Sequence, residues 1–293
     1  MIKKMFFLLL AVVFFASSCS DDGDTTLTTS KLTLDFDDTL EPLGSGYVYE
    51  GWIIVPGEAL PVSTGTFTSV DFPQSFTVNA TQLSAATKFV LSIEPAGETG
   101  DAALMPADTK LLVGDFSGKS ANVSTAIVGD FSTASGAFFL RTPTDETGTN
   151  NGNDQYGVWF GTPGAPPTPN FVLPTLPAGW AYEGWVVGEN GPITTGTFNV
   201  FNMADNFSGF SETSQSGPPV PGEDFFLNAP SGETFPLDVR GRTVVISVEP
   251  VPDDSPAPFV MKPLVGMAGQ DTAPATHDFG QNLGSLPSGK VTR

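Results

Sequence analysis

The stretch Tyr49-Glu50-Gly51-Trp52 recurs as Tyr182-Glu183-Gly184-Trp185, 133 residues further along the chain. In both copies a Pro-x-[Ser/Thr]-Thr-Gly-Thr-Phe block follows, at residues 61–67 and at residues 192–198. A strand, a Gly- or Asn-containing turn and a second strand are typical of a β-hairpin. The glycine and phenylalanine that end the second block are Gly65 and Phe67 in one copy, and Gly196 and Phe198 in the other. We therefore expect the same hairpin twice.

Two further blocks recur in the same order. Val90-Leu91-Ser92-Ile93-Glu94-Pro95 returns as Val245-Ile246-Ser247-Val248-Glu249-Pro250, and Leu112-Val113-Gly114 returns as Leu264-Val265-Gly266. Apolar runs closed by Glu-Pro indicate strands that end there, because proline cannot continue a central ladder. Four blocks in one order indicate an internal duplication.

The segments around these blocks also favour strands. Leu32, Leu34 and Phe36 alternate with polar residues, which is the period of a half-buried strand. The apolar runs at 137–140 and 156–160 predict two more strands, whereas residues 80–86 predict only a short helical turn. The predicted fold class is therefore all-β, as two tandem β-sandwich-like repeats with long Gly/Pro-rich loops.

The domain boundaries follow from the repeat and from composition. We place the first repeat, with its extra strands, at 31–160, and the second at 178–293. Residues 161–177 contain six prolines and predict a stiff linker between the repeats. The offset between the copies rises from 131 to 155, which predicts an inserted loop near 202–242 that can hold a short strand of its own.

Composition excludes several classes of protein. The 293 residues include 12 Lys or Arg, 32 Asp or Glu, one His and one Cys, for a net charge of −20. Such a charge opposes binding to nucleic acid, which requires clustered Lys and Arg side chains to neutralise the phosphates. One cysteine and one histidine exclude a disulfide framework and a zinc ribbon, and we expect no cofactor. The 24 Phe and 40% hydrophobic residues supply enough apolar surface for a core.

The first residues predict export. Lys3 and Lys4 precede an apolar run from residue 5 to 15, as in a secretory signal peptide, and the run is too short to span a membrane. Small residues precede Cys19, an arrangement that resembles the lipobox of bacterial lipoproteins, with Ala16 where Leu is commoner. The resemblance implies a signal peptide at 1–18, a lipid on Cys19 and an acidic tether at 19–30. We expect the lipid to anchor the protein at the bacterial outer membrane or cell surface, with periplasm-facing anchoring as the alternative.

The order of the repeated blocks resembles the extracytoplasmic C-terminal domain of anti-sigma-K factors. The resemblance covers residues 32–114 and 171–269, and its motifs are the Tyr-x-x-Trp strand, the Gly-x-Phe turn and the strand that ends in Glu-Pro. It implies a duplicated outer domain. A lipoprotein signal stands where that family has a sigma-binding helical domain and a transmembrane helix, so we do not expect this chain to sequester a sigma factor.

The repeated glutamates are the first candidates for chemistry. Glu50, Glu94, Glu183 and Glu249 could supply the two carboxylates that glycoside hydrolysis needs. They stand at equivalent places in two copies, however, whereas a catalytic pair is assembled once. We therefore expect strand-end carboxylates bonded to loop amides, no catalytic residues and no enzyme activity. Trp52 and Trp185 share a strand face with apolar residues and are expected in the core, so all the motif residues are expected to be structural.

Three weaker candidates remain. His277 lies next to Asp278, with no nucleophile elbow for it to serve. The segment 145–154 carries oxygen-bearing side chains suited to calcium but lacks EF-hand spacing. Triplets at 24–26, 38–40 and 271–273 resemble the Asp-[Ser/Thr]-apolar acceptors of a bacterial O-glycosylation system.

These observations lead to three functional hypotheses. The first is a non-catalytic cell-envelope lipoprotein that acts in protein interaction, sensing or surface structure through an envelope protein partner. The second is glycan binding through exposed aromatic residues such as Trp159, Phe160 or Trp180. The third is a carboxylate-based hydrolase.

Overall fold

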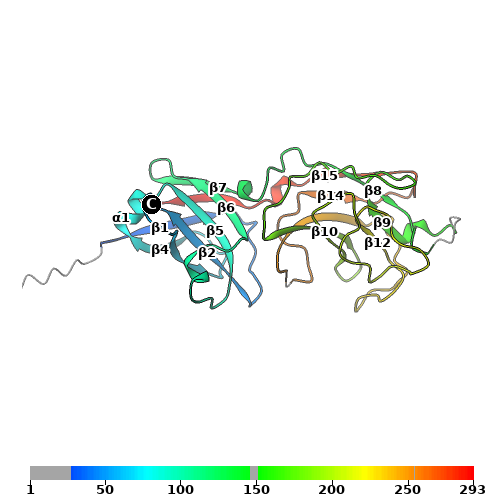
Figure 1. The fold of residues 1–293 in the computed structure, drawn as a ribbon, viewed down its shortest axis with the longest axis horizontal. Coiled ribbons are helices and arrows are strands. Elements are labelled where there is room, and N and C mark those ends of the chain that lie inside the picture. Colours follow the sequence, from blue (N-terminus) through cyan, green and yellow to red (C-terminus); the bar gives the residue numbers. More distant parts are fainter. Residues whose placement is uncertain (1–27, 146–150, 254) are drawn as a thin grey trace, which may run out of the picture.

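The computed structural model describes residues 28–145, 151–253 and 255–293. Within these residues the chain forms sixteen strands in two antiparallel sheets of eight, as the all-β prediction requires (Figure 1). Each sheet curls into a sandwich-like unit with an apolar interior. The signal peptide, Cys19 and most of the acidic tether lie outside the described residues.

The first unit takes its strands from both ends of the described chain. In sheet order the strands are β3 (Val62–Phe67), β2 (Tyr47–Ile54), β5 (Lys88–Pro95), β6 (Lys110–Asp115), β7 (Ser120–Ser124), β16 (Ser288–Thr292), β1 (Thr29–Phe36) and β4 (Gln74–Asn79). The predicted helical turn is α1 (Ala80–Ala85), which the Asn79 side chain caps by accepting from the N–H groups of Thr81 and Gln82. A 3-10 turn, η1 (Ala102–Leu104), lies between β5 and β6.

The second unit is continuous in sequence. In sheet order its strands are β11 (Pro192–Phe198), β10 (Trp180–Val187), β13 (Thr243–Pro250), β14 (Leu264–Met267), β15 (His277–Gln281), β8 (Ala137–Leu140), β9 (Gly157–Phe160) and β12 (Gly222–Asp224). A 3-10 turn, η3 (Asp154–Tyr156), precedes β9. The inserted segment 202–242 supplies only β12 and otherwise runs as loop, as predicted.

The two repeats exchange their last strands. Strands β1–β8 and β9–β16 visit the same eight sheet positions in the same order, but β8 lies in the second unit and β16 in the first. After β7 the chain passes through η2 (Thr125–Ile127) to reach β8, and after β15 it passes through η4 (Leu283–Ser285) to return as β16. Figure 1 shows both passages where the units meet. Each sheet is therefore completed by the other repeat.

This exchange corrects the predicted boundaries. The strands at 137–140 and 157–160, expected with the first repeat, pair within the second sheet, and the C-terminal strand pairs within the first. Residues 161–177 do not link the units, because they connect β9 to β10 inside the second unit. There Thr162 pairs with Thr168 and Val172 pairs with Ser135, so this Pro-rich segment packs along its own unit.

The core lies inside the curled sheets. On β1, Leu32, Leu34 and Phe36 are buried, as their alternation predicts. Most buried apolar residues of both units belong to one continuous cluster, which includes Leu34 and Val291 from the first unit and Phe160 and Val248 from the second. The units are thus joined by apolar packing as well as by the exchanged strands.

A β-bulge explains much of the repeated motif. Gly51 pairs with Gly65 but Trp52 pairs with Ser63, so Thr64 is an extra residue on β3; Gly65 adopts a φ of +118°. The second copy repeats the shift, and Gly196 has a φ of +109°. Positive φ at a bulge favours glycine, which accounts for the Thr-Gly-Thr-Phe block.

Candidate functional site

The tyrosines of the repeated motif anchor the loop that precedes each hairpin. The Tyr49 hydroxyl donates to the Glu41 carbonyl at 2.7 Å, and the Tyr182 hydroxyl donates to the Pro174 carbonyl at 2.6 Å. In each copy the acceptor lies eight residues upstream of the tyrosine. Both rings are buried, and Phe67 and Phe198 stack near them at centroid distances of 5.4 and 6.0 Å. These motif residues therefore hold the fold in the same way twice.

A buried Trp–Ser–Glu chain crosses the opposite face of each sheet. The indole of Trp52 donates to Ser92 Oγ at 2.8 Å, and Ser92 donates to Glu94 Oε1. The second copy repeats both bonds, from Trp185 to Ser247 at 2.8 Å and from Ser247 to Glu249. These indoles are buried as expected, but on the face that looks away from the main apolar cluster.

The glutamate at the end of each chain fixes the loop that follows its strand. Glu94 Oε1 accepts from the Ala107 N–H at 2.9 Å, and Glu249 accepts from the Phe259 N–H at 2.9 and 3.0 Å. Burial raises the pKa of both carboxyls, that of Glu249 to about 8, against the lowering effect of these hydrogen bonds. Pro95 and Pro250 end the two strands, as their sequence predicts.

The hairpin glutamates have hydroxyl partners instead. Glu50 accepts from Ser63 and Glu183 accepts from Thr194, across the same hairpin position in each copy. Each lies close enough to the strand-end glutamate of its copy to raise that carboxyl's pKa. The structure therefore brings together the pairs Glu50/Glu94 and Glu183/Glu249, and in every member a carboxylate oxygen is used to hold neighbouring strands or loops.

The three aromatic residues expected on the surface are buried. Trp159 is 3% exposed, Phe160 0% and Trp180 2%. The Trp159 indole donates to Asp224 Oδ1 at 2.9 Å and to the Arg141 carbonyl at 3.1 Å. The expectation of exposed stacking surfaces at these residues is therefore wrong, because the inserted segment 202–242 and β12 cover Trp159.

The histidine is also used internally. His277 Nδ1 accepts from the Gly269 N–H at 3.2 Å, and its Nε2 lies 2.9 Å from the Asp271 carbonyl. Its ring packs on Phe138 at a centroid distance of 5.3 Å. These contacts fix the turn before β15 and leave neither ring nitrogen free for catalysis.

The segment proposed for calcium is only partly described. Residues 146–150 lie outside the described residues, and Asp145 Oδ2 accepts from the Asn151 and Asn153 side chains at 3.0 and 2.5 Å. Across the described ranges, no group of three or more His, Cys, Asp or Glu side chains is placed to hold a metal ion. The acceptor triplet at 24–26 likewise lies outside these ranges.

Two fully buried acids and a third, partly buried one were not anticipated from the sequence. Glu223 and Asp224 on β12 are fully buried, and Asp205 lies beside them in the inserted segment. Burial raises the pKa of Glu223 to about 8, of Asp224 to about 7 and of Asp205 to about 6. Asp224 accepts from Thr144 and Trp159, and Asp205 accepts from the Gly222 and Phe207 N–H groups. Asp224 thus ties the inserted segment to β9, whereas Asp205 holds the inserted segment together.

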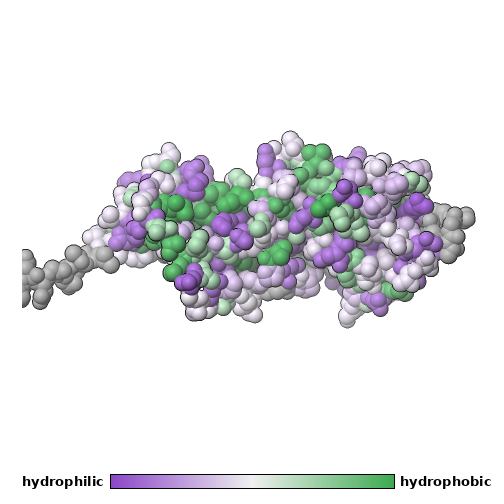
Figure 2. All heavy atoms as spheres, in the orientation of Figure 1, coloured by the Kyte–Doolittle hydropathy of each residue, from purple (hydrophilic) through white to green (hydrophobic). Residues whose placement is uncertain are grey.

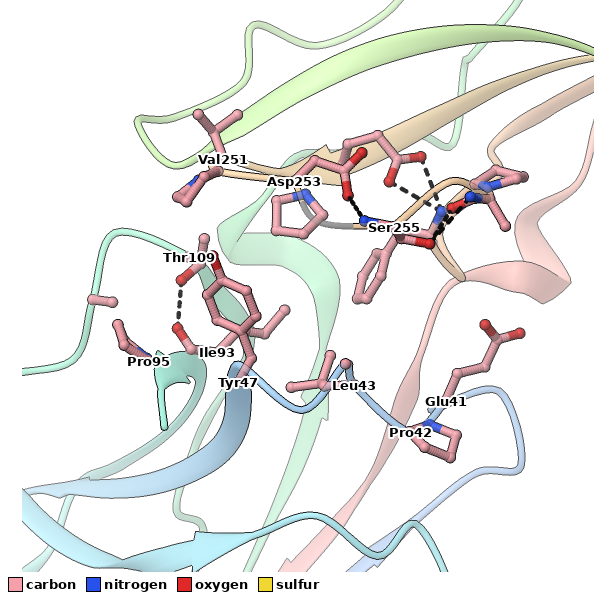
Figure 3. Close-up of a pocket in the computed structure, with 18 of the residues that line it drawn as sticks. Glu41, Pro42, Leu43, Tyr47, Ile93, Pro95, Thr109, Val251, Asp253 and Ser255 are labelled. Atoms are coloured by element: carbon pink, nitrogen blue, oxygen red, sulfur yellow. Dashed lines mark hydrogen bonds between the residues drawn. The ribbon is translucent and has the colours of Figure 1, made fainter. Parts of the chain in front are cut away.

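The two units enclose a cavity of about 220 Å³. Its first wall comes from residues 41–44, Tyr47, the end of β5 and residues 107–109. Its second wall comes from the other unit, from residues 249–253, Ser255 and residues 257–259. Figure 3 shows Tyr47, Leu43 and Ile93 on the first wall, with Val251, Asp253 and Ser255 opposite, and the Glu41 side chain extending from the first unit toward the second. Hydrophobic side chains gather on the surface over the first unit and toward its junction with the second (Figure 2).

A second hollow is polar and open. It lies under the inserted segment and is lined by Thr144, the edge of Trp159, Asp205 and the serine-rich residues 211–217. Two acids line it, Asp205 and Glu212, and Asp205 is already bonded to two N–H groups.

A scan against protein-family models, a search of curated proteins and a search of solved structures each gave no match. The likeness to the outer domain of anti-sigma-K factors therefore stays a prediction from the sequence. Among the described residues, every helix is too short or too polar to cross a membrane.

Proposed function

We propose that this chain is a non-catalytic, lipid-anchored protein of the bacterial cell envelope that binds another envelope protein through the cavity between its two units. The observation that carries this proposal is that the motif residues of both copies make hydrogen bonds within the fold. In both copies the tyrosine, tryptophan and glutamates of the motif are bonded to neighbouring backbone and side chains, which supports a scaffold rather than a reaction centre.

The cavity is the surface that this scaffold leaves for a partner. It combines apolar walls with acidic side chains, and it lies where two units meet, a common position for binding sites. Anchoring rests on the signal-like residues 1–18 and on Cys19, and we propose the duplicated anti-sigma-K-like domain as the ancestry of both units.

Site-specific photocrosslinking in intact cells tests the binding proposal. A photoreactive phenylalanine analogue replaces Tyr47 in the cavity, and a control chain carries it at Asp71, an exposed loop residue outside the cavity. We expect a discrete crosslinked protein from position 47 only. If position 47 gives no crosslink, or the same products as position 71, the proposal fails.

Lipid anchoring has its own test. Mass spectrometry of the purified protein is expected to show an acylated N-terminal peptide that begins at Cys19, and a Cys19→Ser chain is expected to leave the membrane fraction. A soluble, unacylated wild-type chain would contradict the proposed anchor.

A further inference from the structure

The cavity between the units is acidic. The residues that line it include Glu41, Asp108, Glu249 and Asp253, and none of those described there is Lys, Arg or His. Lys110, next in sequence to the lining residue Thr109, has its Nζ 3.9 Å from Asp108 Oδ1 and donates to the Ala107 carbonyl at 2.9 Å. On a chain with a net charge of −20, low-dielectric walls that carry carboxylates concentrate negative potential. The cavity is therefore suited to a cation.

The cavity walls are also poor in hydrogen-bond donors. Five lining residues are prolines, which have no backbone N–H. They are Pro42, Pro95, Pro250, Pro252 and Pro258. Of the remaining donors, the Phe259 N–H is already bonded to Glu249 and the Thr109 hydroxyl to the Ile93 carbonyl. A guanidinium group, which carries five donors and no acceptor, complements such a wall.

Shape and apolar surface point to one side chain. A cavity of about 220 Å³ is smaller than the roughly 300–1,000 Å³ of sites for drug-sized ligands. Tyr47 lines the cavity from the first unit and Phe259 from the second, and Leu43, Ile93 and Val251 add aliphatic side chains. An arginine side chain stacks its planar head on aromatic rings and lays its methylene stem on apolar groups.

From this geometry we propose that the cavity binds an arginine side chain presented by an extended, otherwise apolar segment of a partner protein. The proposal rests on the proposed function and specifies the partner's chemistry. Free arginine would bring an α-ammonium and an α-carboxylate group as well, which have no partners of their own in the apolar part of the cavity. Within a polypeptide the guanidinium enters without those two charged groups.

The groups that would contact the guanidinium come from both units. Glu41 extends from the first unit, and Asp253, whose Oδ1 accepts from the Ser255 N–H at 2.8 Å, lies on the second (Figure 3). Glu249 lies deeper, faced by Ser247, the Phe259 N–H, Asp253 and Glu183, and burial raises its pKa. A bound cation favours the ionised form of Glu249, so we expect peptide binding to release protons near neutral pH.

Isothermal titration of the mature, unlipidated full chain provides the test. The probe is acetyl-Leu-Arg-Leu-amide, and its matched control carries citrulline, the neutral isostere, in place of arginine. We expect the arginine peptide to bind about tenfold more tightly or better, since charge-assisted bidentate bonds are lost in the control. Titrations in buffers of different ionisation heat will show the proton release.

Two variants locate the site. Glu41→Gln and Asp253→Asn each remove one carboxylate of the cavity. Each is expected to lower the affinity for the arginine peptide about fivefold. Glu58→Gln makes the same chemical change at an exposed residue outside the cavity and should leave binding unchanged. Thermal melts of all three chains will confirm that they fold.

Equal binding of the arginine and citrulline peptides would overturn the proposal, as would unchanged affinity in both cavity variants. A protein crosslinked through position 47 whose contact segment lacks arginine would also overturn it while leaving the proposed function intact. Absence of any crosslink together with tight arginine-peptide binding would instead contradict the proposed partner protein.

Discussion

The glycine of each Tyr-Glu-Gly-Trp block leaves room for a threonine of the facing strand. A Cβ at Gly51 would lie 2.4 Å from Thr64 Oγ1, and a Cβ at Gly184 would lie 2.3 Å from Thr195 Oγ1. Both threonines are the extra residues of the bulges, and both point into the interior. The Gly and Thr of the two blocks therefore depend on each other.

Gly51→Ala should accordingly lower the free energy of unfolding by about 1–3 kcal/mol, the usual cost of overpacking. The double variant Gly51→Ala/Thr64→Ala should recover part of that loss, because the clashing Oγ1 is gone. Chemical denaturation of the four chains of this cycle measures the coupling. Gly284→Ala is the control, since a Cβ there meets no atom within 4 Å. Additive effects at 51 and 64 would refute the contact.

The Trp–Ser–Glu chains make a second prediction at this scale. Ser92→Ala removes the acceptor of the Trp52 indole and a donor to Glu94, both buried. Leaving buried polar groups unpaired costs about 1–3 kcal/mol each, so we expect a loss of that order in stability. Ser247→Ala should behave alike, and Ser84→Ala, at an exposed helix residue, should not. Unchanged melting temperatures for both Ser92→Ala and Ser247→Ala would disprove that these hydrogen-bond chains stabilise the fold.

Glu223 makes stability depend on pH. Burial raises its folded pKa from 4.5 to about 8, so between these values the folded chain keeps a proton that the unfolded chain releases. The stability that the raised Glu223 pKa contributes is therefore fully present below pH 4.5 and is lost as the pH rises toward 8. Glu223→Gln stays neutral, and its stability relative to wild type should rise by about 3.5 kcal/mol from pH 5 to pH 8, since the slope approaches about 1.4 kcal/mol per pH unit between the two pKa values. A pH-independent difference would refute the assignment.

At the scale of elements, sequence patterns predicted most strands but not their partners. The hairpins, the Glu-Pro strands and the strand at 137–140 carry clear apolar alternation or runs. In β16 only Val291 is buried and in β12 the residues are Gly-Glu-Asp, so neither has a pattern to read. Charged residues are rarely buried, which is why Glu223 and Asp224 escaped notice. Pairing between distant strands is set by the whole chain, so the exchange of β8 and β16 could not be predicted from local periodicity.

The contacts between the two edge strands of each sheet also differ between the units. In the first, Phe76 of β4 lies against Gly65 of β3 and 5.8 Å from the Phe67 ring, which closes the sheet with apolar contacts. In the second, Asp205 and Phe207 lie against Gly196 of β11, and Asp205 also accepts from the β12 backbone. The insertion thus puts the short strand β12 and a polar contact where the first unit has the longer edge strand β4, which is why Glu223 and Asp224 are buried in the second unit.

At the scale of the molecule, the exchanged strands give the units unequal dependence on the chain ends. The second unit is built from the continuous stretch of strands β8–β15, whereas the first needs β16 between β1 and β7. Val291 is fully buried there, and the Arg293 guanidinium donates to the Leu83, Ala86 and Gly118 carbonyls and lies over the Phe116 ring. Residues 291–293 therefore fasten the first unit.

Removing residues 288–293 should unfold the first unit selectively. The loss takes away β16 and its ladders to β1 and β7, while every ladder of the second unit remains. Hydrogen exchange should show protection lost in β1 and β7 but retained in β10 and β13. A synthetic peptide of residues 285–293 should restore that protection, and the same peptide with Val291→Asp should fail, because it places a charge in the core. Equal loss of protection in both units would mean instead that the shared apolar cluster, rather than the exchanged strand, governs the stability of the first unit.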